Sequence, residues 1–170
     1  DLDVMTNKMT PSGRRDIYRS DLLGQITEYA TYSNLTMLSD AGEMSYDKLG
    51  RLVEWQNTVM NKSVNYVFDA EGQRLSMTDP QSRVTKYGYD LLGNVMGITN
   101  NGTVVAQYAF DGLGRQVEQV LGNGSRVSTG FDESGNLSFI SNMDNAGLLV
   151  QRFAYAYDAI VKAQKILLGQ

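Results

Sequence analysis

The chain has 170 residues, of which 42% are hydrophobic, and its formal net charge is −4. It contains no cysteine and no histidine, which excludes a disulfide framework, a thiol nucleophile, a zinc–cysteine site and a Ser-His-Asp triad. The acidic charge argues against nucleic acid as a partner, and no apolar stretch of the sequence is long enough to span a bilayer.

A short phrase recurs along the chain: an aromatic residue, Asp, two variable positions, Gly, a small polar or basic residue and an aliphatic residue. In the central copies the Asp residues are 21 or 22 positions apart, and a fixed period of this size indicates a repeat architecture. A degenerate copy stands at Asp21, and a last copy, at Asp158, lacks its Gly. We assign a structural turn role to the Asp and Gly of the central copies, which are Asp47, Gly50, Asp69, Gly72, Asp90, Gly93, Asp111, Gly114, Asp132 and Gly135.

Each period is predicted to form two antiparallel strands and two different turns, as residues 90–111 illustrate. Asp90 to Gly93 suits a type I turn followed by a glycine with positive φ, which is a three-residue hairpin loop with a G1 bulge. Residues 94–99 and 103–110 are predicted as strands, and Asn101-Gly102 between them favours a type I′ turn.

The neighbouring periods keep this scheme. Asn123-Gly124 takes the place of Asn101-Gly102 one period later, and Thr78-Asp79-Pro80-Gln81 supplies a proline-containing turn at the same phase. The intervals from Asp21 to Asp47 and from Asp132 to Asp158 are each 26 residues, so we expect larger loops there, the second one at residues 142–147.

The tail at residues 159–170 departs from the repeat. Val161 occupies the position where the other copies have Gly, so the hairpin turn is not expected to form and the ribbon is expected to stop at Tyr157. Ile160, Ala163 and Leu167 would share one face of a short helix, which predicts a helical cap over the end of the sheet. A frayed end is the alternative.

Aromatic residues in the predicted strands alternate with other residues, so that pairs share one face of the ribbon. These pairs are expected to form an aromatic ladder through packing, with a platform for stacking sugars or bases as the rival interpretation. The pairs are Tyr66 and Phe68, Tyr87 and Tyr89, Tyr108 and Phe110, and Tyr155 and Tyr157. Trp55, the single tryptophan, is interpreted as a strand residue of the core or ladder, with an exposed anchor for a partner as the alternative.

The recurring phrase resembles the YD repeat of RHS proteins. The resemblance rests on Tyr87-Gly88-Tyr89-Asp90-Leu91-Leu92-Gly93-Asn94, on Thr78-Asp79-Pro80 before it, and on Tyr46-Asp47-Lys48-Leu49-Gly50-Arg51-Leu52. It implies an all-β fold, an antiparallel β-hairpin repeat ribbon that spirals as an arc of an RHS-type shell. The expected organisation is a YD-repeat array of about seven copies over residues 1–158, followed by the tail at 159–170.

Members of this family differ in function. The resemblance implies kinship with bacterial RHS effectors and the C components of insecticidal toxin complexes, whose shells enclose a toxic segment, and with teneurins, whose shell supports adhesion. It implies a secreted or cell-surface protein of bacterial origin. This sequence shows no self-cleaving core and no toxin-sized tail, and its start at Asp1 rather than Met indicates a processed protein or an excised fragment.

Catalytic and cofactor sites are not expected. Turn chemistry explains the repeated Asp residues, which disfavours both a glycosidase carboxylate pair and a calcium site. The phrase Asp111-Gly112-Leu113-Gly114 is followed by no predicted helix, so it does not form a phosphate loop. We therefore expect a non-catalytic scaffold that self-associates or joins flanking repeats. The alternative is a module that binds a glycan or a cell-surface receptor.

Overall fold

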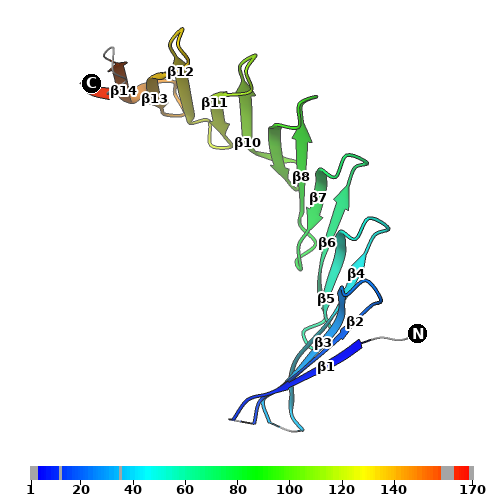
Figure 1. Ribbon diagram of the computed structural model, residues 1–170. Helices are drawn as coiled ribbons and strands as arrows, with labels where there is room; N and C mark the ends of the chain where they lie inside the picture. The colour runs from blue at the N-terminus through cyan, green and yellow to red at the C-terminus, as the bar shows by residue number, and fades with distance from the viewer. Residues whose placement is uncertain (1–3, 12, 35, 158–162, 169–170) are drawn as a thin grey trace. The chain divides into compact units, whose positions relative to one another are not determined.

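The computed structural model of the protein describes residues 4–11, 13–34, 36–157 and 163–168. All the regular secondary structure in this part of the chain is β-strand, and each strand forms an antiparallel hairpin with the strand that follows it within its unit (Figure 1). The chain divides into two compact units, Asp1–Val84 and Thr85–Gln170. The predicted all-β fold of antiparallel hairpins is confirmed.

In the first unit the spatial order of the strands is their order in the chain. Its strands are β1 (Val4–Met9), β2 (Arg15–Ser20), β3 (Ile26–Tyr32), β4 (Leu38–Tyr46), β5 (Leu52–Asn57), β6 (Lys62–Phe68) and β7 (Arg74–Thr78). The second unit follows the same rule with β8 (Val84–Tyr89), β9 (Val95–Asn100), β10 (Thr103–Phe110), β11 (Gln116–Leu121), β12 (Arg126–Phe131), β13 (Leu137–Met143), β14 (Leu149–Tyr157) and β15 (Ala163–Leu168).

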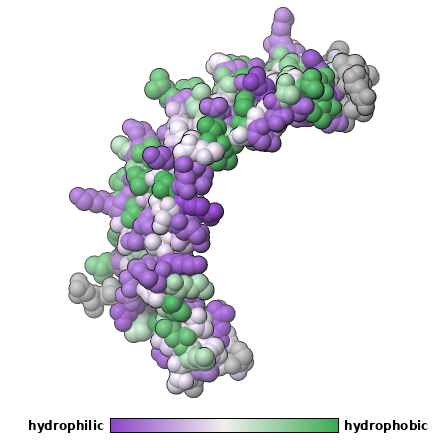
Figure 2. Space-filling model, turned by 180° about the vertical axis from the view of Figure 1, so that it is seen from behind, coloured by the Kyte–Doolittle hydropathy of each residue, from purple (hydrophilic) through white to green (hydrophobic). Residues whose placement is uncertain are grey.

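Neither unit has a conventional core. Among the side chains that the structure describes, Ala106 is the only buried hydrophobic one, whereas Asp16, Asn57 and Ser141 are buried polar residues. The face shown in Figure 2 mixes hydrophobic and hydrophilic residues and carries no continuous apolar surface. A single layer of sheet leaves both faces open, so most strand side chains are only half-buried.

One predicted turn has a different geometry. Asn123-Gly124 is not a two-residue type I′ turn like Asn101-Gly102, where both residues have positive φ (47° and 81°). Gly124 donates from its backbone N–H to the carbonyl of Leu121, and Leu121 donates to Ser125, which closes a three-residue loop. Gly122 supplies the additional loop residue, and only Gly124 of the three has positive φ.

The larger loops expected from the 26-residue intervals are absent from the described residues. Asp144 donates to the carbonyl of Leu148 and Gly147 donates to Asp144, so the loop after β13 contains three residues, as in other periods. The extra length lies in the strands instead, because β13 has 7 residues and β14 has 9. The additional residues of this interval therefore lengthen the strands and not the loop.

The predicted C-terminal helix is wrong. Residues 163–168 form the strand β15, which pairs antiparallel with β14 from Tyr157 opposite Ala163 to Arg152 opposite Leu168. The ribbon therefore does not stop at Tyr157, although residues 158–162 lie outside the described part. A helix this short is marginal in water, whereas a strand satisfies the backbone groups along the edge of β14.

Candidate functional site

The turn at Asp90 shows how the recurring phrase shapes the chain. Gly93 donates from its backbone N–H to the carbonyl of Asp90 over 3.1 Å, and Asp90 donates to the carbonyl of Asn94 over 3.0 Å. The Oδ1 atom of Asp90 accepts the N–H groups of Leu92 and Asn94, each at 2.9 Å. Gly93 has a φ of 86°, a conformation that costs a glycine little.

The other turn residues assigned from the sequence lie in turns of the same kind. In each, the Gly donates to the Asp carbonyl and the Asp carboxylate accepts the backbone N–H four positions later. The glycines all have positive φ, which is 80° at Gly50, 93° at Gly72, 77° at Gly114 and 85° at Gly135. The carboxylates of Asp47, Asp69, Asp111 and Asp132 therefore serve the backbone.

Two turns at the opposite ends of the hairpins, those after Asp79 and Asp144, reuse this geometry. Asp79 and Asp144 each accept the N–H groups two and four positions later. After Asp79 the left-handed position is taken by Ser82, with a φ of 61°, where other turns have Gly. The sequence indicated a turn at Asp79 through Pro80, but aligning it with Asn101-Gly102 in the repeat concealed that this turn has the geometry of the Asp-Gly turns.

Arg51, which follows the glycine of its turn, links two successive turns of the first unit. Its Nε donates to Oδ2 of Asp47 at 2.7 Å, and its Nη1 donates to the backbone carbonyl of Asp69 at 2.9 Å. The guanidinium also lies 4.8 Å from the ring centroid of Phe68. One planar cation thus joins a carboxylate, a carbonyl and an aromatic face.

Arg115 repeats the arrangement in the second unit. It pairs with Asp111, donates to the carbonyl of Gly135 at 3.2 Å, and lies 4.0 Å from the centroid of Phe131. In the degenerate first copy, Gln25 likewise donates to the carbonyl of Gly50 at 2.9 Å. Sequence reasoning missed this link between turns, although the basic residue after the glycine was its signal.

The aromatic pairs lie in the strands and are half-buried, but their direct cross-strand neighbours are mostly not aromatic. Tyr66 lies opposite Met77, and Tyr87 lies opposite Ile98. Within a unit, the rings of successive periods are two strands apart, roughly 10 Å, which exceeds the range of ring–ring contact. An arginine lies over some of the rings instead: the guanidinium of Arg74 is 5.8 Å from the ring centroid of Tyr66. Trp55 is also half-buried, opposite Met44 and Val64.

Hydrogen bonding to the turn carboxylates shifts their acidity. The backbone N–H of Arg51 is the main reason why the pKa of Asp47 lies below its ordinary value, and Arg115 does the same for the pKa of Asp111. For Asp90, the Asn94 side chain contributes most to the lowered pKa. These groups are ionised at neutral pH and already have their partners, which suits a structural role better than acid–base catalysis.

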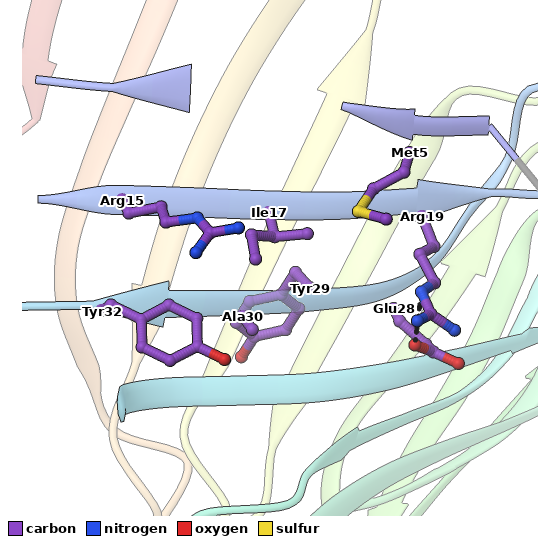
Figure 3. A pocket seen from close by; sticks show the side chains of 8 residues that line it. All are labelled: Met5, Arg15, Ile17, Arg19, Glu28, Tyr29, Ala30 and Tyr32. Carbon is purple, nitrogen blue, oxygen red and sulfur yellow. Dashed lines mark ion pairs between the residues drawn. The ribbon is translucent and has the colours of Figure 1, made fainter. Parts of the chain in front are cut away.

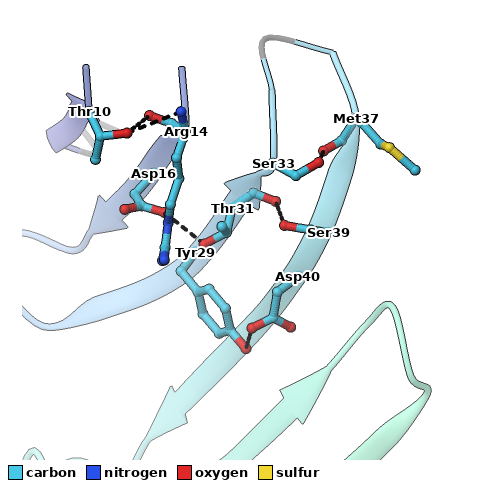
Figure 4. Close-up of polar contacts among 9 residues, drawn as sticks. All are labelled: Thr10, Arg14, Asp16, Tyr29, Thr31, Ser33, Met37, Ser39 and Asp40. Carbon is cyan, nitrogen blue, oxygen red and sulfur yellow. Dashed lines mark hydrogen bonds and ion pairs between the residues drawn. The ribbon is translucent and has the colours of Figure 1, made fainter. Parts of the chain in front are cut away.

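A polar cluster lies on one face of β2 to β5, and its members on β2 to β4 are drawn in Figure 4. Asp16 accepts from Thr31 Oγ1 at 2.9 Å and from Arg14 Nε at 3.0 Å, which together lower its pKa. Asp40 accepts from the Tyr29 hydroxyl at 3.3 Å and from Asn57 Nδ2 at 2.6 Å. Burial, with Asp40 alongside, raises the pKa of Tyr29. The members satisfy one another, so the cluster holds strands together.

The other face of β1 to β3 carries a hollow of about 420 Å³ (Figure 3). Arg15 lies opposite Tyr32, with its guanidinium 5.9 Å from the ring centroid, and Arg19 lies opposite Glu28, with an Nε to Oε2 distance of 3.4 Å. Ile17 and Met5 add apolar surface. Tyr32 with Arg15 at one end of the hollow offers a stacking surface, and Arg19 with Glu28 at the other end offers hydrogen-bonding groups.

The described part of the chain offers neither a metal-binding cluster nor a membrane-spanning helix. No group of three or more His, Cys, Asp or Glu residues within the described ranges could hold a metal ion. In the same residues, no helix has the length and apolar character that crossing a bilayer requires.

Residues 68–105 match the family described as RHS Repeat. No curated protein matches the chain. Among solved structures, the chain is similar to the crystal structure of TcdB2-TccC3 (TM-score 0.62, 14% identity) and to that of TcdB2-TccC3-TEV (TM-score 0.61, 15% identity), covering 96% of this chain and 11% of the other in both. It is also similar to a structure of the Photorhabdus luminescens Tc holotoxin pore (TM-score 0.59, 14% identity), with 99% and 11% covered.

The chain therefore spans about a ninth of the length of the structures it resembles. At this level of identity, the similarity to solved structures shows the fold alone. The family match shows in addition that residues 68–105 have the sequence pattern of the RHS Repeat. The resemblance to the RHS/YD-repeat family is thereby confirmed: residues 68–105 match the RHS Repeat, and the chain has an antiparallel hairpin fold similar to that of the TcdB2-TccC3 structures.

Proposed function

We propose that the chain is a non-catalytic scaffold: a wall segment of an RHS-type shell that encloses a toxic or otherwise harmful cargo. The observation that carries this proposal is the one-layer sheet, in which Ala106 is the only buried hydrophobic side chain among those described. Such a sheet buries too little apolar surface to be the whole of a stable structure. In a shell wall, one face of the sheet would be covered by the material that the shell encloses. The residues of the array are 1–158, with the tail at 159–170 continuing or closing it.

The chemistry of the repeated residues supports a structural role. Their carboxylates accept backbone N–H groups within their own turns, and the arginines that follow link one turn to the next. The sequence contains neither His nor Cys, so the commonest general base and thiol chemistry are missing. A secreted or cell-surface location in a bacterium, and assembly with flanking repeats, accompany this proposal.

A protease-protection assay on the complete protein encoded by the gene tests the scaffold function. If the repeats form a shell wall, the enclosed segment resists an added protease until the shell is denatured. The control is the same segment expressed alone, which should be digested at once. A segment that is digested equally fast in both forms would refute the proposal.

A second candidate function is glycan binding, which the hollow on β1 to β3 favours. Tyr32 offers a ring for a sugar face, and Arg19 with Glu28 offers donors and acceptors for hydroxyl groups. A glycan array probed with the wild type and with Tyr32→Ala tests this function, with Tyr155→Ala as a control in the second unit. Signals that are absent, or that survive Tyr32→Ala, would leave the scaffold function alone.

A further inference from the structure

The hollow on β1 to β3 contains an arginine that the chain orients but does not neutralise. Arg15 donates from its Nε to Oδ1 of Asn7 over 3.3 Å. Its guanidinium lies 5.9 Å from the ring centroid of Tyr32, at one end of the hollow (Figure 3). Within the part of the chain that the structure describes, Arg15 forms no ion pair and neither of its Nη atoms has a hydrogen-bond acceptor. The two Nη groups can therefore donate to a ligand.

Two arginines that link turns have the same kind of ring contact but a different balance of charge. Arg51 lies over Phe68, and it pairs with the Asp of its own turn and donates to a carbonyl of the next turn. Arg115 lies over Phe131 and makes the equivalent pair of contacts. The charge of these two side chains is used within the chain. Arg15 has the ring without the carboxylate, so a ligand can supply the missing acid.

The opposite end of the hollow is already neutral. Arg19 and Glu28 form an ion pair there, with an Nε to Oε2 distance of 3.4 Å, and about half of each side chain is exposed. Together they offer donors and acceptors, which neighbouring sugar hydroxyl groups require because a hydroxyl both donates and accepts. The Glu28 carboxylate repels a second negative charge. The hollow therefore suits a ligand with one anionic group, placed at the Arg15 end.

The distance between the two ends sets the length of the ligand. Arg15 and Arg19 are four residues apart on β2, which corresponds to roughly 13 Å along the strand. Ile17 and Ala30 lie between them as a directly opposed pair, and both line the hollow. This middle part offers an apolar surface to the C–H groups of a sugar. The span is longer than one sugar ring, so a disaccharide is the smallest saccharide that reaches both ends.

We infer that the hollow binds an acidic disaccharide whose uronic-acid carboxylate accepts hydrogen bonds from the Nη groups of Arg15. The ring that carries this carboxylate stacks on Tyr32, and the neutral second sugar extends over Ile17 to Arg19 and Glu28. A polyanion such as nucleic acid is disfavoured by Glu28 and by the net charge of −4. The inference rests on the glycan-binding candidate, which it deepens by naming the charge and length of the ligand, and it is independent of the scaffold function.

Isothermal titration calorimetry on the full chain tests the inference with a disaccharide of glucuronic acid and glucose and with the methyl ester of the same disaccharide. The wild type should bind the acid at least about tenfold more tightly than the ester, and glucuronic acid alone should bind more weakly than the disaccharide. Arg15→Gln should bind acid and ester equally. The matched control is Lys8→Gln, which removes the same charge from the other face of β1, where Lys8 lies opposite Asp16, and should keep the preference. A circular dichroism melt establishes that each variant is folded.

Arg15→Lys separates recognition of the carboxylate from general attraction of charge. It keeps the positive charge but not the planar fork, so most of the preference for the acid over the ester should be lost. The inference is overturned if the wild type binds neither sugar, does not distinguish acid from ester, or keeps its preference in Arg15→Gln. It is also overturned if a glutamate-containing tetrapeptide binds as tightly with the same dependence on Arg15. Binding of acid and ester alike that requires Tyr32 would overturn the inference but support the glycan-binding candidate, and the protease-protection assay tests the scaffold function separately.

Discussion

At the scale of single residues, the fold depends on a carboxylate and a glycine in each turn. The Asp carboxylate accepts the backbone N–H four positions later and in several turns a second one, and the Gly adopts a left-handed conformation that closes the loop. Both requirements concern residues at most four positions apart. This locality explains why the turns of the repeat could be predicted from residue types and spacing.

Gly112 and Gly114 allow a matched test, since both lie in one turn and a Cβ added at either would meet no obstructing atom within 4 Å. Gly114 has a φ of 77°, whereas Gly112 is not among the residues with positive φ. Gly114→Ala should therefore destabilise the protein by about 1 kcal/mol or more, and Gly112→Ala should be neutral or slightly stabilising. Thermal melts of the two variants measure the difference. Equal midpoints would contradict the conformational argument.

The turn carboxylates also predict how stability depends on pH. The pKa values of Asp47, Asp90 and Asp111 are lower in the folded chain than their ordinary values, so the unfolded chain binds protons more readily. Their stabilisation is complete above the ordinary pKa of about 4 and is lost as the pH falls through the lowered values. The melting midpoint should be level between about pH 5 and 7 and drop below about pH 4. A melting midpoint that stays unchanged below about pH 4 would show that the turn carboxylates do not stabilise the fold in this way.

At the scale of elements, the link between hairpins is the arginine after the turn glycine. The Arg51 side chain contacts Asp47 in its own turn and the carbonyl of Asp69 in the next, 18 positions along the chain. Such a contact depends on the distance and twist between hairpins, which no local pattern contains. For this reason the sequence predicted the turns but not the link between them.

Arg51→Lys should cost roughly 1 kcal/mol, because an ammonium group cannot reach the Asp47 carboxylate and the Asp69 carbonyl together. Lys48→Ala in the same turn is the control, since Lys48 is exposed and surface changes of this kind usually stay within about 0.5 kcal/mol. Urea denaturation of both variants gives the comparison. An Arg51→Lys variant as stable as Lys48→Ala would show that the link contributes nothing.

Element boundaries were predicted less well than element types. Asn123-Gly124 matched a two-residue turn, but Gly122 joins the loop, because Leu121 pairs with Ser125 and the Gly122 N–H donates to the carbonyl of Val105 in β10. The C-terminal residues Ile160, Ala163 and Leu167 matched a helical spacing by chance over a short stretch. There the free edge of β14, which is a tertiary feature, selects a strand.

At the scale of the whole molecule, the single layer leaves backbone edges whose pairing matters. β14 has 9 residues, among them the exposed Leu149 and Val150, and β15 pairs with six of the nine. Deleting residues 159–170 should expose this edge and promote aggregation, with a lower melting midpoint. Removing only residues 169–170 is the control. If the longer deletion leaves both light scattering and the melt unchanged, β15 has no protective role.

The repeat period predicted the fold because the same turn sequence recurs in successive hairpins. A single chain therefore contains several independent examples of one local pattern. The function was harder to predict from the sequence, because the role of a one-layer sheet depends on what the sheet encloses, and the repeat pattern does not specify this. The hollow beside Tyr32 is formed by the three consecutive strands β1 to β3, and it depends on the register between them, which the turn pattern alone does not specify.

Cryo-electron microscopy of the complete protein encoded by the gene tests the central claim most directly. If the chain is a shell-wall segment, strands β1 to β15 will be found within a continuous hairpin wall that surrounds an enclosed segment. If these strands instead form a separate module outside any enclosure, with both faces of the sheet in solvent, the account is contradicted.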